Sequence, residues 1–506
     1  MNNFITKIIN KDINYGLPKN KIKFRFAPEP NGFLHIGHVK AIYINFKLAE
    51  YFNSKIYLRF DDTNPNNEKL YFVENIINNI NWLGFKWDKI TYTSDYFNIL
   101  YKLAKKMIIN NKAYVEYFNI KNNKKIIIND IDKNLYYFSN MKKGKYNENE
   151  FVLRANTTKN LSKYHIKDPV MYRIIKKNHY KTYNKWCIYP TYDWAHGQTD
   201  YIEKISHSLC SIEFQNHKLL YNWFINNVYN KKYNIYKPKQ IEFSRLNIID
   251  TLTSKRKLNF LITKKIINRY DDVRLSTLIS LKNKGYKSIY IINFIKNIGF
   301  TRRNINISIK KLELETKKYI IKKTNILMVI LNPIKLIISN FKKNKIKWIK
   351  INNNLNIPFT KYIYIEYNDF KLKKDKNFYR LSFKNYIRLK YSYIIKAYKI
   401  IKKNKIIKKI FCKIYKNINK EKIKSTIQWV SYNYKYRINI LDYKYIYFKN
   451  NNIYNINSIK KIPAYIDLFT LNKLKINNIY QFLRIGFFFY NSPKNFIKMF
   501  YLEKKY

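Results

Sequence analysis

The sequence predicts an α/β fold in the N-terminal half of the chain and a β-rich C-terminal third. Three patterns support this: strands alternate with helices between residues 21 and 84, helical segments follow residue 248, and short alternating segments begin near residue 310. A chain of 506 residues exceeds what one hydrophobic core normally serves, so we expect two to four domains.

The N-terminal pattern indicates a parallel sheet. Strand, helix, strand and helix are predicted in turn over residues 21–26, 36–49, 56–60 and 70–83. Gly84 ends the second helix. This order is typical of parallel strands joined by right-handed crossovers. Ligands bind beyond the carboxyl ends of such strands, which is where the segment from Glu29 to His38 and the pair Asp61-Asp62 fall.

The composition is strongly basic and aromatic. Lys and Arg number 99 against 32 Asp and Glu, for a formal charge of +67, and 18% of residues are aromatic. Such a surface suits a polyanion, because binding releases counterions and aromatic rings offer stacking faces. Lys, Asn, Ile, Tyr and Phe are abundant together while Gly and Pro are scarce, so AT-rich codon bias explains the excess of Lys equally well. The charge therefore favours nucleic-acid binding without establishing it.

The cysteines and the apolar segments suggest a cytoplasmic protein. Cys187, Cys210 and Cys412 have no CxxC spacing, which argues for a reducing compartment and predicts no structural metal. Residues 1–20 contain no apolar core, and the apolar run 326–331 is too short to span a bilayer, so no membrane partner is expected.

The segment from Arg25 to His38 has the features of a phosphate site. It turns a strand into a helix through Gly32 and Gly37, where the backbone can approach a ligand closely. A helix N-terminus attracts phosphate, and His35 lies three residues before His38 on the same face, so both can donate to phosphate oxygens. A metal half-site or a surface pair remains an alternative for the two histidines.

Two short motifs resemble the signatures of class I aminoacyl-tRNA synthetases. His-Ile-Gly-His at 35–38 resembles the first signature, and Leu-Thr-Ser-Lys-Arg-Lys-Leu at 252–258 resembles the Lys-Met-Ser-Lys-Ser loop, in the right order and at a suitable distance. Thr253 stands where the family more often has Met. The role of the loop rests on Lys255, whose compact charge can meet pyrophosphate oxygens.

Further segments resemble glutaminyl-tRNA synthetases, closely between residues 21 and 300. They cover residues 59–65, 186–193, 207–214 and 240–247. Glutamyl-tRNA synthetases share the fold and typically carry Ser for Asn31 and Arg for Cys210. An arginine fork suits a carboxylate, so Cys210 favours glutamine, although a buried small apolar residue would look the same. A catalytically inactive RNA-binding relative is the other alternative.

The resemblance implies a role for each matched residue. Asp61 would hold the α-ammonium of glutamine and Tyr192 its side chain. The full glutamine-binding set is Arg25, Asp61, Tyr192, Cys210 and Gln240. The ATP-binding set is Glu29, Pro30, Asn31, His35, Gly37, His38, Arg245 and Lys255, of which His35, His38 and Lys255 are catalytic. The anticodon candidates are Arg380, Arg388, Lys390, Gln481 and Arg484. For each residue a structural role is the alternative: helix capping for Asp61, packing for Tyr192, a solvated basic face for the anticodon set.

The resemblance also implies an architecture. A Rossmann-type catalytic domain over 21–93 and 190–247 would be split by an acceptor-binding insertion, followed by a signature loop and helical connecting domain and by β-barrel anticodon-binding domains. The last three parts are 94–189, 248–323 and 324–506. The implied reaction activates glutamine with ATP and Mg²⁺ to glutaminyl-adenylate and transfers it to the 3′ end of tRNA(Gln). We expect a monomer. Ile326 occupies a place where relatives tend to have Arg.

Overall fold

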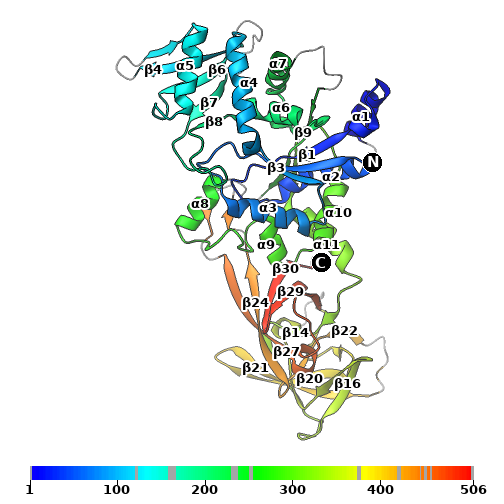
Figure 1. Ribbon diagram of the computed structural model, residues 1–506. Helices are drawn as coiled ribbons and strands as arrows, with labels where there is room; N and C mark the ends of the chain where they lie inside the picture. Colours follow the sequence, from blue (N-terminus) through cyan, green and yellow to red (C-terminus); the bar gives the residue numbers. More distant parts are fainter. Residues whose placement is uncertain are drawn as a thin grey trace. The chain divides into compact units, whose positions relative to one another are not determined.

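The computed structural model describes residues 3–119, 124–157, 167–229, 237–249, 255–372, 378–416, 418, 423–444, 446–448, 453–455 and 458–502 (Figure 1). The chain divides into two compact units. Unit 1 comprises Met1–Ile249, Thr253–Phe260 and Ser288–Ile309, and unit 2 comprises Asp250–Leu252, Leu261–Lys287 and Lys310–Tyr506.

Unit 1 contains the predicted parallel sheet, with strand order β1-β2-β3. The elements are β1 (Lys23–Phe26), α2 (Ile36–Tyr51), β2 (Lys55–Phe60), α3 (Leu70–Trp82) and β3 (Lys89–Tyr92). Phe24, Leu58 and Phe60 are buried on the apolar face of the sheet. Gly84 has a φ of 88°, the left-handed conformation that ends a helix. The predicted order of strands and helices is therefore confirmed.

A second group of strands and helices continues this sheet region. It consists of α6 (Tyr192–Ile202), β9 (His207–Ser211), η4 (Ile212–Phe214), α7 (Lys218–Val228) and β10 (Lys239–Phe243). β9 lies beside β1, because Ser206 N donates to Lys23 O at 3.1 Å, and β10 pairs with β9 in parallel. The start of β9 therefore lies beside the start of β1, and further along the two strands Arg25 Nη1 donates to Leu209 O at 3.0 Å.

In the sequence, an antiparallel sheet with two helices is inserted between these two groups of strands; it is drawn in cyan at the top of Figure 1. Its strand order is β5-β4-β6-β7-β8. The short helix η2 (Thr93–Tyr96) precedes this insertion. The insertion consists of α4 (Phe97–Ile109), β4 (Ala113–Asn119), β5 (Lys124–Ile127), α5 (Ile131–Lys142), β6 (Phe151–Ala155), β7 (Val170–Ile174) and β8 (Ile188–Pro190). Phe138, Tyr172 and Trp186 share one core with Trp194 of α6 and Phe224 of α7. The inserted segment is thus packed continuously onto its neighbours.

An N-terminal helix, α1 (Phe4–Asn14), was not predicted from the sequence. Its N-cap is Asn3, whose Oδ1 accepts from the amides of Ile5 and Thr6 at 2.9 Å. Ile5 and Ile9 are fully buried. Near its other end, Asp12 contacts two residues of the sheet region: it accepts from Lys239 Nζ at 2.7 and 2.8 Å and lies 3.2 Å from His207 Nε2.

The described residues of the segment 246–320 form helices and two strands. They are β11 (Leu246–Ile249), α8 (Lys255–Thr263), α9 (Leu278–Asn283), α10 (Ser288–Ile298), β12 (Ile305–Ser308) and α11 (Ile309–Ile320). β11 pairs with β12 in parallel. The ring of Tyr43 in α2 stacks on Phe300, just after α10, with 5.8 Å between centroids. This contact joins α10 to the sheet region within unit 1.

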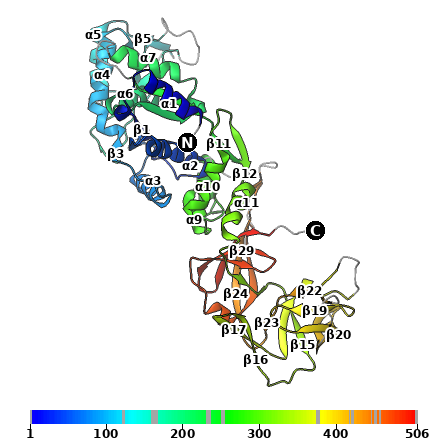
Figure 2. The same cartoon turned by 90° about the vertical axis from the view of Figure 1, so that its right-hand side faces the viewer.

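Unit 2 contains two seven-stranded sheets, seen as two groups of strands in Figure 2. The first has the order β13-β28-β29-β30-β24-β27-β14: β13 (Ile326–Leu327), β28 (Ile479–Phe482), β29 (Gly486–Ser492), β30 (Asn495–Tyr501), β24 (Lys435–Tyr443), β27 (Ile459–Asp467) and β14 (Val329–Ile330). The second has the order β22-β19-β20-β21-β15-β18-β23: β22 (Ile423–Ile427), β19 (Tyr386–Leu389), β20 (Ile394–Lys403), β21 (Ile406–Tyr415), β15 (Pro333–Ile338), β18 (Tyr362–Glu366) and β23 (Val430–Ser431).

Each sheet encloses its own apolar core. Phe482 and Phe488 belong to the first core, and Trp429 and Phe359 belong to the second. Smaller elements complete the unit: η6 (Tyr367–Asp369), α12 (Leu468–Leu471), and the hairpins β16–β17 (Lys347–Asn352, Leu355–Phe359) and β25–β26 (Tyr447–Phe448, Ile453–Tyr454). The pairing of β24 with β27 ends at Tyr443 and Ile459, and β25 begins at Tyr447.

In the part of the chain that the structure describes, no helix combines the length and apolar character needed to cross a membrane.

Candidate active site

The two signature histidines lie at the N-terminus of α2 and cap it. His35 is the N-cap residue, and its Nδ1 accepts from Gly37 N at 3.1 Å. His38 Nδ1 accepts from His35 N, also at 3.1 Å. The ring centroids are 3.8 Å apart. Both rings therefore satisfy amides that the first turn of a helix leaves unpaired.

The protonation state of the pair follows from these contacts. Burial, together with the smaller effect of the nearby positive charge of Arg245, lowers the pKa of His38 to about 4. Burial also lowers the pKa of His35 well below its usual value, with His38 and Arg245 acting in the same direction. Both rings are thus neutral at pH 7. Because each Nδ1 accepts a hydrogen bond, the single ring proton lies on Nε2, so each histidine can donate from Nε2.

Gly37 permits the close approach of the two rings. A Cβ atom at this position would lie 2.8 Å from Cε1 of His35 and 3.1 Å from Leu246 O. A side chain would therefore displace either the His35 ring or the backbone after Arg245. Arg245 itself is half exposed and forms an ion pair with Glu213. The structure thus brings His35, His38 and Arg245 together, as predicted.

The second signature motif is described only in part. Residues 250–254 lie outside the described residues, and so does the side chain of Lys255, the third predicted catalytic residue. The backbone of Lys255 begins α8.

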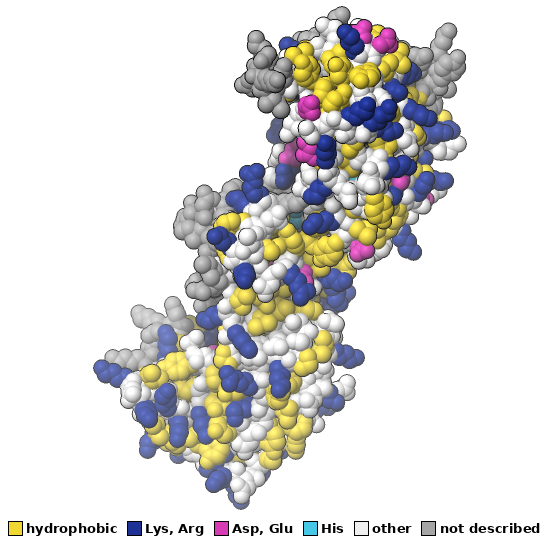
Figure 3. All heavy atoms as spheres, turned by 60° about the vertical axis from the view of Figure 1, so that its left-hand side comes forward, with side chains coloured by type: hydrophobic (Ala, Val, Ile, Leu, Met, Phe, Trp, Pro, Cys, Tyr) yellow, Lys and Arg dark blue, Asp and Glu magenta, His cyan; other side chains and the backbone are white. Residues whose placement is uncertain are grey.

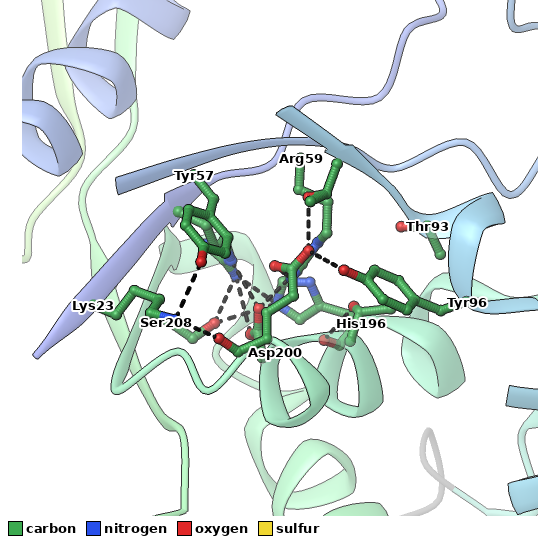
Figure 4. Close-up of polar contacts among 12 residues, drawn as sticks. Lys23, Tyr57, Arg59, Thr93, Tyr96, His196, Asp200 and Ser208 are labelled. Atoms are coloured by element: carbon green, nitrogen blue, oxygen red, sulfur yellow. Dashed lines mark hydrogen bonds and ion pairs between the residues drawn. The ribbon is translucent and has the colours of Figure 1, made fainter. Parts of the chain in front are cut away.

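Arg25 belongs to a buried polar network. Its partners His196, Asp200 and Ser208 are labelled in Figure 4. Its Nε donates to Asp200 Oδ1 at 2.9 Å, and its Nη2 lies 2.6 Å from Ser208 Oγ. Nη2 also lies 2.9 Å from His196 Nε2, and Nη1 donates to Leu209 O at 3.0 Å. Among the described residues Nη1 makes this one hydrogen bond, so one of its two hydrogens remains for a ligand.

Asp200 and Glu203 of α6 hold a second buried arginine. Arg59 Nη2 donates to Asp200 at 2.6 Å, and Arg59 Nη1 donates to Glu203 at 2.8 Å. Burial alone would raise the pKa of Asp200, but Arg25 and Arg59 hold it well below its usual range. Burial lowers the pKa of His196 to about 3, so this ring is neutral. Sequence reasoning missed this network; the one local signal is the i, i+4 spacing of His196 and Asp200 on α6.

Asp61 is a buried carboxylate without a cationic hydrogen-bond partner in the described parts of the chain. It is 7% exposed, and Thr93 Oγ1 donates to it at 3.4 Å. Burial raises its pKa to about 6, while Arg59 lowers it and Glu29 raises it. The neighbouring Asp62 accepts from Ser94 N and Oγ at 2.8 and 2.7 Å. Asp62 is therefore a structural residue, whereas Asp61 is suited to a ligand ammonium group.

Three predicted glutamine-binding residues lie close to Arg25. Tyr192 begins α6 and stacks on His196 with 4.7 Å between centroids. Its hydroxyl makes no hydrogen bond to the described residues, and burial, followed by Cys210, raises its pKa well above the usual value. Gln240 Nε2 donates to Phe214 O and to Glu242, both at 3.1 Å. Cys210 is 8% exposed and pairs in register with Glu242 on β10.

The remaining ATP-site candidates form the turn after β1. Glu29 is exposed and Pro30 is buried. Asn31 N donates to Glu29 O at 2.9 Å, and Lys69 N donates to Pro30 O at 3.2 Å. These bonds fix the turn against the start of α3, and Glu29 is close enough to Asp61 to raise its pKa.

In unit 2 the structure brings together two of the anticodon candidates. Arg380 Nη1 and Arg484 Nη2 each donate to Asp369 at 2.8 Å. Sequence reasoning did not single out Asp369, which has no local motif around it.

The other three anticodon candidates make no described contact with this pair. Arg388 is exposed on β19, and the ammonium of Lys390 lies 4.7 Å from the ring centroid of Tyr391. Gln481 pairs in register with Ile326, which is 51% exposed. The structure therefore does not gather the five candidates into one cluster.

Among the described residues, no group of three or more His, Cys, Asp or Glu side chains is arranged to hold a metal ion. The three cysteines are free thiols.

Known protein families match nearly the whole chain. The catalytic domain of the class I tRNA synthetases (E and Q) matches residues 21–322. Two anticodon-binding domain families of the same group match residues 327–415 and 426–491.

Curated relatives match along most of their length. A glutamine–tRNA ligase of Buchnera aphidicola subsp. Acyrthosiphon pisum (strain APS) is 41% identical, over 98% of this chain and 94% of the relative. The glutamine–tRNA ligase of Clostridium kluyveri is 35% identical over 96% and 93%. That of Rhodopirellula baltica is 34% identical over 96% and 86%.

Proposed function

The chain belongs to the class I aminoacyl-tRNA synthetases of the E and Q group, and we propose that it is a glutamine–tRNA ligase. It uses ATP to activate glutamine and transfers the glutaminyl group to the 3′ end of tRNA(Gln). The family resemblance seen in the sequence is confirmed by the relatives and by the family matches. The choice between glutamine and glutamate rests on the side-chain end of the amino-acid site.

The observation that carries this choice is the charge around Cys210. Glutamyl-tRNA synthetases typically carry an arginine at the position of Cys210, whereas this chain has a neutral thiol there. Burial, together with the smaller effect of the negative charge of Glu242, raises the pKa of the Cys210 thiol to about 12. Arg25 is the nearest buried cation, and it is paired with Asp200. Lys218 is paired with Glu242 at 3.2 Å. A glutamate carboxylate would thus be desolvated beside Glu242 with both nearby cations already paired, which is unfavourable by several kcal/mol.

The polar groups of the site suit an amide instead. The hydroxyl of Tyr192, which makes no hydrogen bond to the described residues, is available to the glutamine side chain. Asp61 holds the α-ammonium group as its counter-ion. These contacts orient the glutamine carboxylate for reaction.

Activation proceeds by attack of that carboxylate on the α-phosphorus of MgATP, with pyrophosphate leaving. The Nε2–H groups of His35 and His38 donate to phosphate oxygens, and Arg245 and Lys255 supply positive charge as the transition state develops negative charge. No side chain acts as a covalent nucleophile. The terminal ribose hydroxyl of the tRNA then attacks the adenylate carbonyl, and AMP leaves.

We assign the parts of the chain accordingly. Residues 21–93 and 190–247 form the Rossmann-type catalytic domain, 94–189 grip the acceptor end, 248–323 carry the signature loop and helical connection, and 324–506 read the anticodon. On the face drawn in Figure 3, Lys and Arg side chains greatly outnumber Asp and Glu, as an RNA-binding surface requires. The protein is proposed to act as a cytoplasmic monomer.

The test is kcat/KM for glutamine and for glutamate in aminoacylation of purified tRNA(Gln). We expect a preference for glutamine of about 10⁴ or more, because a site built around an amide rejects its charged analogue. Comparable values, or a preference for glutamate, would identify a glutamyl enzyme. Binding of tRNA without any activation would identify an inactive RNA-binding relative.

A further inference from the structure

We infer that the hairpin formed by β20 and β21 binds the phosphate backbone of double-helical RNA, whatever the sequence of that RNA. The part concerned is residues 398–409, termed the basic ribbon. The basic ribbon contains no residue of the amino-acid site, the ATP site or the anticodon set. The inference goes beyond the proposed function, because it concerns RNA that the chain need not aminoacylate.

The basic ribbon extends beyond the sheet that carries it, and both of its strands are labelled in Figure 1. β19 pairs with β20 only at the first two residues of β20, and β15 pairs with β21 only from Lys409 onward. From residue 402 to residue 408 each strand therefore has only the other as its neighbour among the described residues. Every residue of the ribbon is exposed except Ile400 and Ile407, which are half buried.

The base of the basic ribbon is held against the sheet. The hydroxyl of Tyr398 shares a hydrogen bond with the hydroxyl of Ser339, directly after β15. The ring of Tyr398 contacts that of Phe411 with 6.4 Å between centroids, and the ammonium of Lys413 lies 5.4 Å from the centroid of the Tyr398 ring. These contacts orient the ribbon before a ligand binds, so less conformational freedom is lost on binding.

The positive charge of the basic ribbon is dense and uncompensated. Six of its twelve residues are Lys and none is Asp or Glu; the six are Lys399, Lys402, Lys403, Lys405, Lys408 and Lys409. Lys and Arg make up 99 of the 506 residues of the chain, about one in five, so codon bias alone does not produce this density. All six lysines are exposed, and none forms an ion pair or a side-chain hydrogen bond with the described residues. Their charges therefore remain for a polyanion.

The turn at the tip adds to this charge. Lys403 pairs with Ile406, which leaves a two-residue turn formed by Asn404 and Lys405. The φ angles of the turn residues are 51° and 61°, the left-handed conformation that a type I′ turn requires at both positions. Gly is the usual second residue of such a turn, and a residue with a side chain is uncommon there. This hairpin therefore carries a cation at its outermost point, where a neutral residue would fit the backbone better.

Lysines lie on both faces of the basic ribbon. Lys402 pairs with Ile407 and Lys403 with Ile406, and neighbouring cross-strand pairs point to opposite faces. Each face thus carries a lysine beside an isoleucine. An element that lies on a membrane surface collects its apolar side chains on one face, which this ribbon does not do.

Double-helical RNA fits this arrangement, because phosphates line both sides of its grooves. Proteins recognise such RNA by its shape and backbone, and lysine meets phosphate as a point charge without reading a base. Two-stranded ribbons are among the elements that enter nucleic-acid grooves. The basic ribbon also lies within residues 327–415, which match an anticodon-binding domain family. Charge, shape and family therefore favour RNA as the occupant.

The experiment measures binding of the full chain to a mixed-sequence RNA duplex over a series of salt concentrations. The ribbon variant is Lys402→Gln/Lys403→Gln/Lys408→Gln/Lys409→Gln. We expect its affinity at low salt to fall at least about tenfold. The salt dependence, as the slope of log K against log salt, should fall by about two to four, because each lost phosphate contact lowers it by about one. An unchanged affinity and slope, or no duplex binding by the unmodified chain, would overturn the inference.

A matched variant separates the basic ribbon from the overall charge of the chain. Lys342→Gln/Lys343→Gln/Lys345→Gln/Lys347→Gln removes four exposed lysines of the same unit, between the end of β15 and the start of β16. It changes the net charge equally and should alter duplex affinity less than about twofold. An equal loss in this control would assign the binding to net charge and contradict the inference. Replacing the four ribbon lysines by Arg keeps the charge and should keep the affinity; a loss there, as would follow from misfolding, also counts against it.

Two further ligands distinguish RNA duplex from other polyanions. The same variants are tested with poly(U) and with vesicles that contain phosphatidylserine. If the ribbon variant loses vesicle binding and keeps duplex binding, the basic ribbon is a membrane-surface element and the inference is wrong. A loss confined to poly(U) would show a single-strand site and reject it equally.

The proposed function can fail separately from this inference. The kcat for glutaminylation at saturating tRNA(Gln) should be unchanged in the ribbon variant, because the ribbon contacts neither glutamine nor ATP. The amino-acid preference tests the proposed function, whereas duplex affinity tests the basic ribbon, so each result stands without the other.

Discussion

The guanidinium group of Arg25 lies against the carboxylate of Asp200, with 2.9 Å between Nε and Oδ1. Neither side chain is more than 2% exposed, and Arg59 shares the same carboxylate oxygen at 2.6 Å. The pair joins the carboxyl end of β1 to α6, so the wall of the amino-acid site and the packing of unit 1 depend on one buried charge network.

Asp200→Ala should therefore destabilise unit 1 strongly. It leaves two buried arginines without their shared partner, and breaking a buried pair in this way costs about 3–5 kcal/mol in the free energy of unfolding. Urea unfolding of the variant measures the change. The matched control is Glu50→Gln, which removes a surface pair with Lys47 (2.5 Å) and should cost about 0.5 kcal/mol or less. Similar losses in both variants would contradict the role of the network.

His38 should act through Nε2 in catalysis and through Nδ1 in capping α2. His38→Ala should lower the rate of glutamine activation by about 10²–10³, as loss of an oxyanion donor does. His38→Asn retains an acceptor near the position of Nδ1, so it should preserve stability but not activity, whereas His38→Gln places a donor near Nε2 and should recover part of the activity. Single-turnover kinetics together with thermal unfolding distinguish these outcomes. Normal activation in His38→Ala would remove the histidine from the mechanism.

Glutamine binding should weaken as the pH falls through the pKa of Asp61. That pKa is raised to about 6 by burial, so the carboxylate is ionised at pH 7.5 and largely protonated at pH 5.5. A neutral acid attracts the α-ammonium group poorly. The KM for glutamine, measured with saturating tRNA, should therefore rise about fourfold between pH 7.5 and 5.5.

Asp61→Asn provides the control for this pH dependence. Asp62 also titrates nearby, with a pKa raised to about 7 by burial, and it is unchanged in the variant. The variant should bind glutamine weakly, and its KM should be nearly constant over this range. A variant that keeps the full pH dependence would assign the effect to Asp62 instead.

Cys210→Arg should damage the use of glutamine and reduce the preference over glutamate by at least about tenfold from about 10⁴. The new guanidinium would offer a fork for a carboxylate, although Glu242 lies opposite in register and would compete for it. Full conversion is not expected, because the surrounding residues also orient the pocket. Cys210→Ala, which adds no charge, should leave the preference unchanged. The measurement is kcat/KM for both amino acids.

The sequence predicted those parts of the fold that local patterns determine. Alternation over residues 21–26 and 56–60 corresponds to β1 and β2, and the helical spacing after His35 corresponds to α2. The position of Asp61 was also predictable, because a polar residue directly after a buried strand lies at the ligand-binding edge of a parallel sheet.

The parts that were missed depend on contacts between distant residues. Asp200 lies 175 positions from Arg25, and Asp369 lies 115 positions from Arg484, so no local pattern reveals either pairing. Helix α1 is a different case. Its signals are local, namely the Asn3 cap and the buried Ile5 and Ile9, but its many polar residues concealed them.

Helix α1 also has a consequence for synthesis on the ribosome. Its partners His207 and Lys239 lie 195 and 227 residues after Asp12, so they are translated long after the helix leaves the exit tunnel. At typical elongation rates the delay is about 10–40 s. Over that interval Asp12 lacks both of these partners, and isolated helices of eleven residues are marginal in water. The contacts of Asp12 therefore form only after β9 and β10 have been synthesised, although α1 precedes both by almost 200 residues or more.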